Sequence, residues 1–381
     1  MKKVLFILPS LATGGLERVQ VTLANALASR GHDVTVLALE PADDLRADLD
    51  KRVHYRHTPH KPHPIGSKLP YIRHKFYDDG MWETRASAKT LYQYYVGSEP
   101  FDVEIAFFRG LPIKIISGST SKTSVKLAWV HSDFRLAGGY KNNFSSLDAV
   151  RSAYSSFDKV VCVSSEAKKG FVETIGDTKN LTVVHNPLPV EKIRALGEER
   201  LAMPTKKGAF HLVLVARLLD SAKGQCRLVS VVKRLVDEGF DLSLTFVGGG
   251  PDEEKIKRSI EAAGLSSVVA LAGNQKNPYP FIKEADLLVC ASYYEGYNLT
   301  VAEALILGVP VLSTRCSGPV EILDGGKYGR IVENTDEALY EGLKNLLLYP
   351  EELAEYRACS SRRTAFFDDA ETAKKVEALF V

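Results

Sequence analysis

The sequence that decides the fold lies at residues 291–304, Ala-Ser-Tyr-Tyr-Glu-Gly-Tyr-Asn-Leu-Thr-Val-Ala-Glu-Ala, in which Glu295 and Glu303 stand eight positions apart. An apolar strand pattern, 285–290, runs into this stretch, and a helical pattern, 301–307, leads out of it. Strand, polar loop and helix in this order are typical of a parallel α/β sheet. We therefore expect Glu295 on the loop at the strand's carboxyl end and Glu303 in the first turns of the helix.

This loop has the chemistry of a binding site for a phosphate with hydroxyl groups beside it. The N–H groups of a helix N-terminus and the helix dipole attract phosphate, and carboxylates accept hydrogen bonds from hydroxyl groups. The alternative for either glutamate alone is that it only stabilises the helix dipole. The residues described below favour the binding site.

Length and composition narrow the class of protein. The chain has 381 residues, which predicts two or three domains, and 45% hydrophobic with 25% charged residues is ordinary for a globular protein. A net charge of +2 gives no reason to expect a nucleic-acid partner, and no apolar run is long enough to span a bilayer. The five cysteines show no C-x-x-C spacing, which indicates reduced thiols in a cytoplasmic protein rather than disulfides or zinc ligands.

Two α/β units extend along the chain. The first begins with strand 4–8, a loop containing Gly14 and Gly15, and helix 16–30. Its further strands are expected at 34–38, 103–107, 125–130, 159–163 and 181–184. Asn186-Pro187 breaks this pattern. The second unit is expected to contain strands 211–216, 242–247, 268–272, 285–290 and 309–313, with helices near 224–238 and 252–263. Helices are also predicted from about Lys75 to Tyr95 and over 351–381.

The fold class is therefore α/β, with two Rossmann-like, doubly wound parallel-sheet domains facing across a cleft. Such sheets bind ligands at the carboxyl ends of their strands.

Several candidate residues follow these strands directly. Arg217 and Lys223 come after strand 211–216, where Arg offers a bidentate fork and Lys a point charge to phosphate; the alternative is a pair of solvated surface cations. Gly249 lies in a glycine turn, and Gly14 and Gly15 in a βα turn; each lets the backbone approach a ligand or simply turn.

His131 follows strand 125–130 at its carboxyl end. A single histidine is more often structural than catalytic, but this position favours a functional one. Asp133 would either orient His131 or cap the next segment.

Together these motifs resemble those of the retaining group 1 (family 4) glycosyltransferases of the GT-B fold, in particular the bacterial surface-polysaccharide type. The matching residues are the Glu295/Glu303 pair, 308–311, the glycine turn 247–251, Ala216-Arg217 with Lys223-Gly224, and, less specifically, 10–17, 129–133 and 185–187. The resemblance implies an N-terminal acceptor domain at 1–188, a nucleotide-sugar domain at 189–365, and a C-terminal helix at 366–381 that crosses back to the first domain.

The resemblance also implies a reaction. A hexose would pass from a nucleotide-diphosphate sugar, expected to be a UDP-sugar, to a glycan or lipid-linked saccharide, with retention of anomeric configuration. The implied catalytic residues are His131, Glu295, Arg217 and Lys223. The implied donor-binding residues are Gly14, Gly15, Arg217, Lys223, Gly249, Glu295, Gly296, Tyr297, Asn298, Leu299, Thr300 and Glu303.

No metal or other cofactor is expected, because cations and helix N-termini can stabilise the departing diphosphate. Three alternatives stay open: a sugar-nucleotide epimerase of the same fold, a phosphorylase, and a non-catalytic sugar-nucleotide or glycan-binding module.

The segment 51–77 departs from this pattern, because it is basic, rich in histidine and contains no Asp or Glu. Lys68, Arg73 and Lys75 are candidates for contact with a lipid-linked acceptor or an anionic membrane surface; the alternative is a solvated basic loop. The expected location is the cytoplasm, with peripheral attachment to the inner face of the cell membrane left open.

Overall fold

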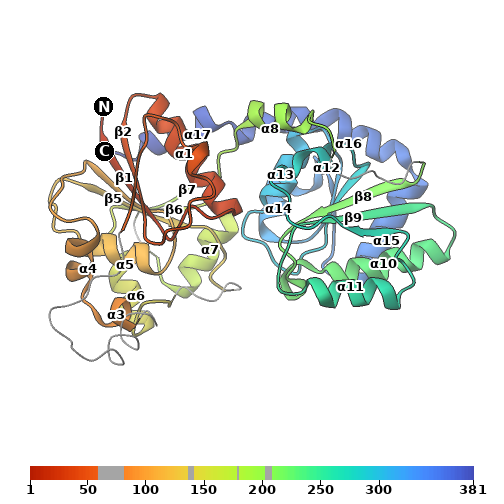
Figure 1. Ribbon diagram of the computed structural model, residues 1–381, viewed down its shortest axis with the longest axis horizontal. Helices are drawn as coiled ribbons and strands as arrows, with labels where there is room; N and C mark the ends of the chain where they lie inside the picture. Colours follow the sequence, from red (N-terminus) through yellow and green to blue (C-terminus); the bar gives the residue numbers. More distant parts are fainter. Residues whose placement is uncertain (59–80, 136–140, 178–179, 202–207) are drawn as a thin grey trace. The chain divides into compact units, whose positions relative to one another are not determined.

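The computed structural model describes residues 1–58, 81–135, 141–177, 180–201 and 208–381 (Figure 1). By its internal contacts the chain divides into two compact units. Unit 1 contains residues 1–187 and 369–381, and unit 2 contains residues 188–368. Each unit has a central parallel sheet with helices around it, so the predicted class of two α/β parallel-sheet domains is confirmed.

In unit 1 the described residues form a seven-stranded sheet in the order β3-β2-β1-β4-β5-β6-β7. All neighbours pair in parallel, from Lys3 opposite Asp33 to Cys162 opposite Val183. The strands are β1 (Lys3–Leu8), β2 (Asp33–Ala38), β3 (His54–His57), β4 (Val103–Ala106), β5 (Val125–Val130), β6 (Lys159–Cys162) and β7 (Leu181–Val183). Strand β3, at the sheet edge, was not predicted.

Five helices of unit 1 begin at a serine or glycine N-cap. Ser87, Ser146 and Ser164 each accept a hydrogen bond from an amide of the first helical turn. The elements are α1 (Gly15–Ser29), η1 (Arg46–Asp48), α3 (Met81–Arg85), α4 (Ala88–Tyr95), α5 (Leu111–Ser117), α6 (Leu147–Tyr154), α7 (Ser165–Thr174) and α17 (Asp369–Glu377). The single helix predicted up to Tyr95 is wrong, because extended Ser87 ends one helix and caps the next.

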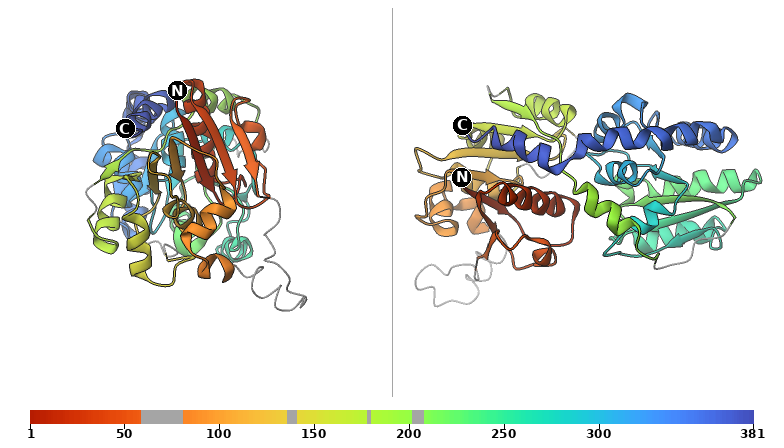
Figure 2. Two further views of the ribbon diagram at one scale, coloured as in Figure 1. Left: turned by 90° about the vertical axis from the view of Figure 1, so that its left-hand side faces the viewer. Right: turned by 90° about the horizontal axis from the view of Figure 1, so that it is seen from above.

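The predicted continuous helix over 351–381 is also wrong. It is divided into α16 (Pro350–Arg363), η3 (Thr364–Phe367) and α17. At the break, the Leu188 amide donates to the Phe367 carbonyl over 2.9 Å. Beyond it, α17 packs on α1 within unit 1, as the dark blue and dark red helices of Figure 2 show. The His32 side chain, in the loop after α1, is buried here, with Nε2 2.8 Å from Glu377.

In unit 2 the described residues form a six-stranded parallel sheet in the order β10-β9-β8-β11-β12-β13. Its strands are β8 (Phe210–Val215), β9 (Leu242–Val247), β10 (Val269–Leu271), β11 (Leu287–Cys290), β12 (Val311–Thr314) and β13 (Arg330–Val332). The helical segments are α8 (Val190–Gly197), α9 (Asp220–Lys223), α10 (Gln225–Asp237), α11 (Glu253–Ala262), α12 (Tyr279–Lys283), α13 (Leu299–Ile306), α14 (Ser317–Ile322), η2 (Asp324–Gly326), α15 (Asp336–Leu348), α16 and η3.

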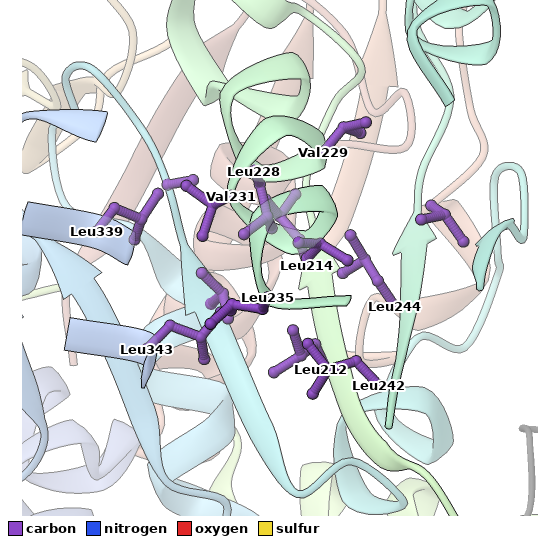
Figure 3. Packing of buried hydrophobic residues seen from close by; sticks show 14 of the residues in the cluster. Leu212, Leu214, Leu228, Val229, Val231, Leu235, Leu242, Leu244, Leu339 and Leu343 are labelled. Carbon is purple, nitrogen blue, oxygen red and sulfur yellow. The ribbon is translucent and has the colours of Figure 1, made fainter. Parts of the chain in front are cut away.

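The core of unit 2 lies between its sheet and α10 with α15 (Figure 3). Leu228, Val231 and Leu235 recur at helical spacing on α10 and are buried with leucines of β8 and β9 and with Leu339 and Leu343 of α15. Full burial of each such side chain contributes about 1.5–3 kcal/mol. This packing fixes the carboxyl ends of β8 and β11, which are adjacent at the point where the strand order reverses.

Candidate active site

The site in unit 2 is built on the two loops that follow β8 and β11. The loop after β8 leads into the short helix α9, which ends at Lys223, and the loop after β11 carries Glu295 and ends at α13. The Tyr293 amide donates to the Ala222 carbonyl over 2.9 Å, so the backbone itself joins the loops. The strand order reverses between these strands, which is where doubly wound sheets bind ligands.

An ion pair between Lys223 and Glu295 lies at this junction. The ammonium Nζ is 2.8 Å from each carboxylate oxygen, Oε1 and Oε2, and the side chains are 25% and 7% exposed. Burial disfavours the charged lysine, but attraction to Glu295 and the hydrogen bonds outweigh it and hold the pKa of Lys223 above its usual value. Lys223 therefore carries its charge at neutral pH.

Two further side chains hold the carboxylate. Ser292 Oγ donates to Glu295 Oε1 over 2.6 Å, and Asn298 Nδ2 donates to the same oxygen over 3.0 Å. Asn298 has left-handed backbone (φ 64°), and its Oδ1 accepts from Thr300 Oγ1 and from the Val301 amide, so it also caps α13. The N-terminal end of α13 is thereby fixed beside Glu295.

The other residues predicted along this loop surround the same turn. Gly296, Leu299 and Thr300 are half-buried, and Tyr297 is buried. A Cβ at Gly318 would lie 2.2 Å from the Tyr297 carbonyl oxygen, so α14 packs directly on the turn's backbone. Glu303 is buried in α13, with Oε1 3.4 Å from the hydroxyl of Tyr279 on α12.

Arg217 and Lys223 both follow β8, but they differ in exposure and in bonding partners. Arg217 is exposed, and among the residues that the structure describes its guanidinium has no hydrogen-bond or ion-pair partner, whereas Lys223 is bound to Glu295. Nearby, a Cβ at Gly248 or Gly250 would lie 2.1 or 2.3 Å from a carbonyl oxygen of the loop after β8. Gly249 is less confined, because a Cβ there would meet its nearest neighbour, Asn274, at an ordinary contact distance of 3.7 Å.

His131 lies in unit 1, directly after β5. Its Nε2 is 2.8 Å from the Phe107 carbonyl oxygen and therefore donates, which leaves Nδ1 as the unprotonated nitrogen. Nδ1 is buried and has no hydrogen-bond partner in the described part of the chain. Burial lowers the pKa of His131 to about 4, so the ring is neutral at pH 7. Asp133 does not orient it but pairs with Arg135, whose Nε donates to Oδ1 over 2.9 Å.

Gly14 and Gly15 stand at the start of α1, Gly14 as the N-cap and Gly15 as the first helical residue. A Cβ at Gly14 would lie 2.1 Å from Oε2 of Glu17, so this carboxylate folds back over the helix start. Burial raises the pKa of Glu17.

Comparison with known proteins matches both halves of the chain. Residues 197–362 match the family model of group 1 glycosyl transferases, and residues 13–81 match that of Glycosyltransferase Family 4. The chain thus contains a region similar to group 1 glycosyl transferases, and this region lies within unit 2.

An uncharacterised glycosyltransferase of Methanocaldococcus jannaschii is 34% identical over 45% of this chain and 43% of its own length. The N-acetylgalactosamine-N,N'-diacetylbacillosaminyl-diphospho-undecaprenol 4-alpha-N-acetylgalactosaminyltransferase of Campylobacter jejuni is 25% identical over 61% of this chain and 64% of its own length. The chain thus matches less than two thirds of the length of these two relatives. Among solved structures, Anabaena HepE with UDP and glucose has the same fold, with a TM-score of 0.75, 16% identity and 99% of each chain covered.

Sequence reasoning missed two residues that support the site in unit 2, Ser292 and Arg227. Arg227 of α10 is buried; Nη1 donates to the Asn334 side chain over 2.8 Å and to the Ala291 carbonyl over 3.4 Å. Its guanidinium lies 4.5 Å from the ring centroid of exposed Tyr293. In the sequence Arg227 cannot be distinguished from an ordinary charged residue on a helix. Ser292 lies three residues before Glu295, and this proximity is a signal that could have identified it.

Three of the predicted residues cannot be placed in the structure. Lys68, Arg73 and Lys75 lie outside the described residues. Within the described ranges, no three His, Cys, Asp or Glu side chains are grouped as metal ligands. A search of the same residues finds no helix with the length and apolar character needed to cross a membrane.

Proposed function

We propose that this chain transfers a hexose from a nucleoside-diphosphate sugar, expected to be a UDP-sugar, to a glycan or a lipid-linked saccharide. The observation that carries the proposal is the Lys223–Glu295 ion pair beside the start of α13, the helix that carries Glu303, where the strand order reverses. The match of residues 197–362 to the group 1 glycosyl transferase model supports the transferase activity. HepE, whose structure was solved with UDP and glucose, supports the choice of a UDP-sugar as donor.

Each residue has a proposed role within unit 2. Arg217, which is exposed and unpaired among the described residues, binds the diphosphate together with Lys223 and the α13 amides. The Glu303 carboxylate accepts hydrogen bonds from the ribose hydroxyls, and the Glu295 carboxylate accepts hydrogen bonds from hydroxyls of the donor sugar. Gly249 leaves room beside the nucleotide.

In unit 1, Gly14 and Gly15 are proposed to contact the donor phosphate or the acceptor. His131 is proposed to contact the transferred sugar, its Nδ1 serving as a neutral acceptor for a hydroxyl.

The proposed chemistry is retention by a front-face route. The bond between the anomeric carbon and the diphosphate oxygen breaks, the acceptor oxygen bonds to the same face, and the departing phosphate takes the acceptor's proton. Arg217, Lys223 and the α13 N-terminus stabilise the leaving charge, so no metal is required. NMR of the product's anomeric proton checks the stereochemistry, and an inverted product would exclude this route. Activity that is abolished by EDTA and restored by a divalent ion would exclude metal independence.

The decisive experiment is calorimetric titration with UDP, GDP and ADP. We expect one nucleotide to bind, and Glu303→Ala to weaken it at least tenfold, about 1.4 kcal/mol. Glu261→Ala is the matched control, because Glu261 is exposed on α11 of the same unit. If no nucleotide binds, the proposed donor site is wrong, and the result favours a phosphorylase or a glycan-binding module. Release of free sugar without acceptor would indicate the epimerase.

The acceptor is proposed to be a lipid-linked or surface-polysaccharide glycan, with the chain acting in the cytoplasm at the inner membrane face. The Campylobacter jejuni relative, whose name gives a diphospho-undecaprenol acceptor, supports this choice. Reversing the charges of Lys68, Arg73 and Lys75 should abolish co-sedimentation with anionic liposomes, because basic residues near a membrane contribute about 1 kcal/mol each. Unchanged binding would reject the membrane contact.

A further inference from the structure

The two oxygens of the Glu295 carboxylate are held differently. Oε1 accepts from Lys223, Ser292 and Asn298 at 2.8, 2.6 and 3.0 Å. Among the described residues Oε2 has one partner, the Lys223 ammonium at 2.8 Å. If the ammonium left, Oε1 would keep two neutral donors and its position, while Oε2 would be left buried without a donor.

Lys223 is also a proposed ligand of the donor diphosphate, so the ammonium has two competing anionic partners. An ammonium is a point charge on a flexible stem, which can turn from one anion to another. Its present partner is almost fully buried, and a buried carboxylate that loses its counter-charge is strongly disfavoured unless new donors replace it. A nucleoside diphosphate alone brings no such donors, whereas a nucleoside-diphosphate sugar brings hydroxyl groups.

We propose that donor binding is a partner exchange, in which the diphosphate takes the Lys223 ammonium and a sugar hydroxyl replaces it at Oε2 of Glu295. Ser292 and Asn298 act as positioning residues, because they hold Oε1 throughout the exchange. The consequence is a preference for the intact sugar nucleotide over the nucleoside diphosphate product, since only the former satisfies Oε2. The inference rests on the proposed function, because it assumes that the diphosphate binds beside Lys223.

The exchange is tested by UDP affinity, measured calorimetrically in wild type and Glu295→Gln, with GDP in parallel. The neutral amide of this variant cannot form an ion pair, so Lys223 is released, and we expect UDP to bind at least tenfold more tightly, about 1.4 kcal/mol. The matched control is Asp237→Asn, which removes the carboxylate from the exposed Lys233–Asp237 pair on α10 and should leave UDP affinity unchanged. Equal or weaker UDP binding by Glu295→Gln would overturn the exchange.

Loss of a negative charge near the site could by itself improve anion binding, and a double-mutant cycle separates the two effects. In a Lys223→Gln background, the exchange predicts no gain from Glu295→Gln, because no ammonium remains to be released. A gain of the same size in that background would assign the effect to simple repulsion and overturn the exchange. If Glu295→Gln does not fold, Glu295→Asp replaces it, because its shorter side chain withdraws the carboxylate from Lys223 and should also tighten UDP binding.

The outcomes also distinguish failure of the proposed function from failure of the partner exchange alone. If neither UDP nor GDP binds wild type or variant, the proposed function fails and the exchange fails with it. If a nucleotide binds and Glu303→Ala weakens it, but Glu295→Gln changes nothing, the function stands and the exchange alone is overturned.

Discussion

Gly224 and Ala291 lie in direct contact, although they come from different loops of unit 2. A Cβ at Gly224 would stand 2.3 Å from the Ala291 carbonyl oxygen, and the Gly224 backbone is left-handed with φ 65°. This residue separates α9 from α10 and comes directly after Lys223. Close approach and left-handed backbone both require glycine here, so the position of the ion pair depends on a residue without a side chain.

We therefore expect Gly224→Ala to destabilise unit 2 by about 3 kcal/mol, the sum of left-handed strain and steric overlap. Gly239→Ala is the control, because Gly239 is also left-handed (φ 94°) but has open space around it; about 1 kcal/mol is expected. Both tryptophans, Trp82 and Trp129, lie in unit 1. Tryptophan fluorescence therefore reports the unfolding of unit 1, whereas circular dichroism reports both units. The part of the circular dichroism transition that has no counterpart in fluorescence measures the unfolding of unit 2. Equal losses in the two variants would contradict the contact.

Arg227 gives a second prediction about unit 2. Replacing it by Met removes the buried cation that links Ala291, Asn334 and the Tyr293 ring and that pairs with Asp336; stability should fall by about 2–3 kcal/mol, because two buried acceptors lose their donor. Lys233→Met on the same helix is the comparison, because its pair with Asp237 is exposed and should contribute less than about 1 kcal/mol. The same circular dichroism measurement applies. A small effect of Arg227→Met would mean that the buried network is not stabilising.

His131 makes the stability of unit 1 depend on pH. Its pKa is about 4 in the folded state and about 6.5 when unfolded. Between these values the unfolded chain takes up a proton that the folded chain does not, so stability falls as pH is lowered from about 6.5 to about 4, by up to about 3 kcal/mol. Urea unfolding followed by tryptophan fluorescence should show this slope, and His131→Gln should reduce it. Exposed His57→Gln is the control; a slope unaffected by His131→Gln would refute the assignment.

The attachment of α17 can be tested at Glu377. Glu377→Ala should lower the stability of unit 1 by about 1–2 kcal/mol, because the buried His32 Nε2–H loses its acceptor and Arg30 loses its partner. Tryptophan fluorescence during urea unfolding measures this. Glu371→Ala, in the exposed pair with Lys374 on the same helix, should change stability by less than about 0.5 kcal/mol. The reverse order of effects would show that His32 does not need this acceptor.

The sequence predicted the fold well where strands are buried on both faces. Strands β1 and β11 are almost entirely apolar runs, and the structure has them at the predicted places. It failed for two edge strands. The residues of β3 (His54–His57) are polar and mostly exposed, so they carry no apolar pattern, and β13 (Arg330–Val332) is only three half-buried residues long. The helix breaks at Ser87 and near Asp368 were also missed, because local capping and contacts distant in sequence decide them.

The candidate site was predictable as a set of residues but not as a set of contacts. Glu295 and Glu303 belong to one local motif, so spacing alone places them near one helix start. Lys223 and Glu295 are 72 residues apart, and only the pairing of β8 with β11 brings them together. The role of Ser292 on the carboxylate likewise depends on side-chain geometry that no periodicity encodes.

The return of residues 369–381 to unit 1 has a consequence for biosynthesis. A ribosome makes the chain from the N-terminus, so all of unit 2 has been translated before α17 emerges. During that time the surface of α1 that α17 covers stays open, and buried His32 and Phe380 have not yet met. The second unit to be synthesised can therefore complete its own fold first, and the domain that begins the chain is the last to be closed.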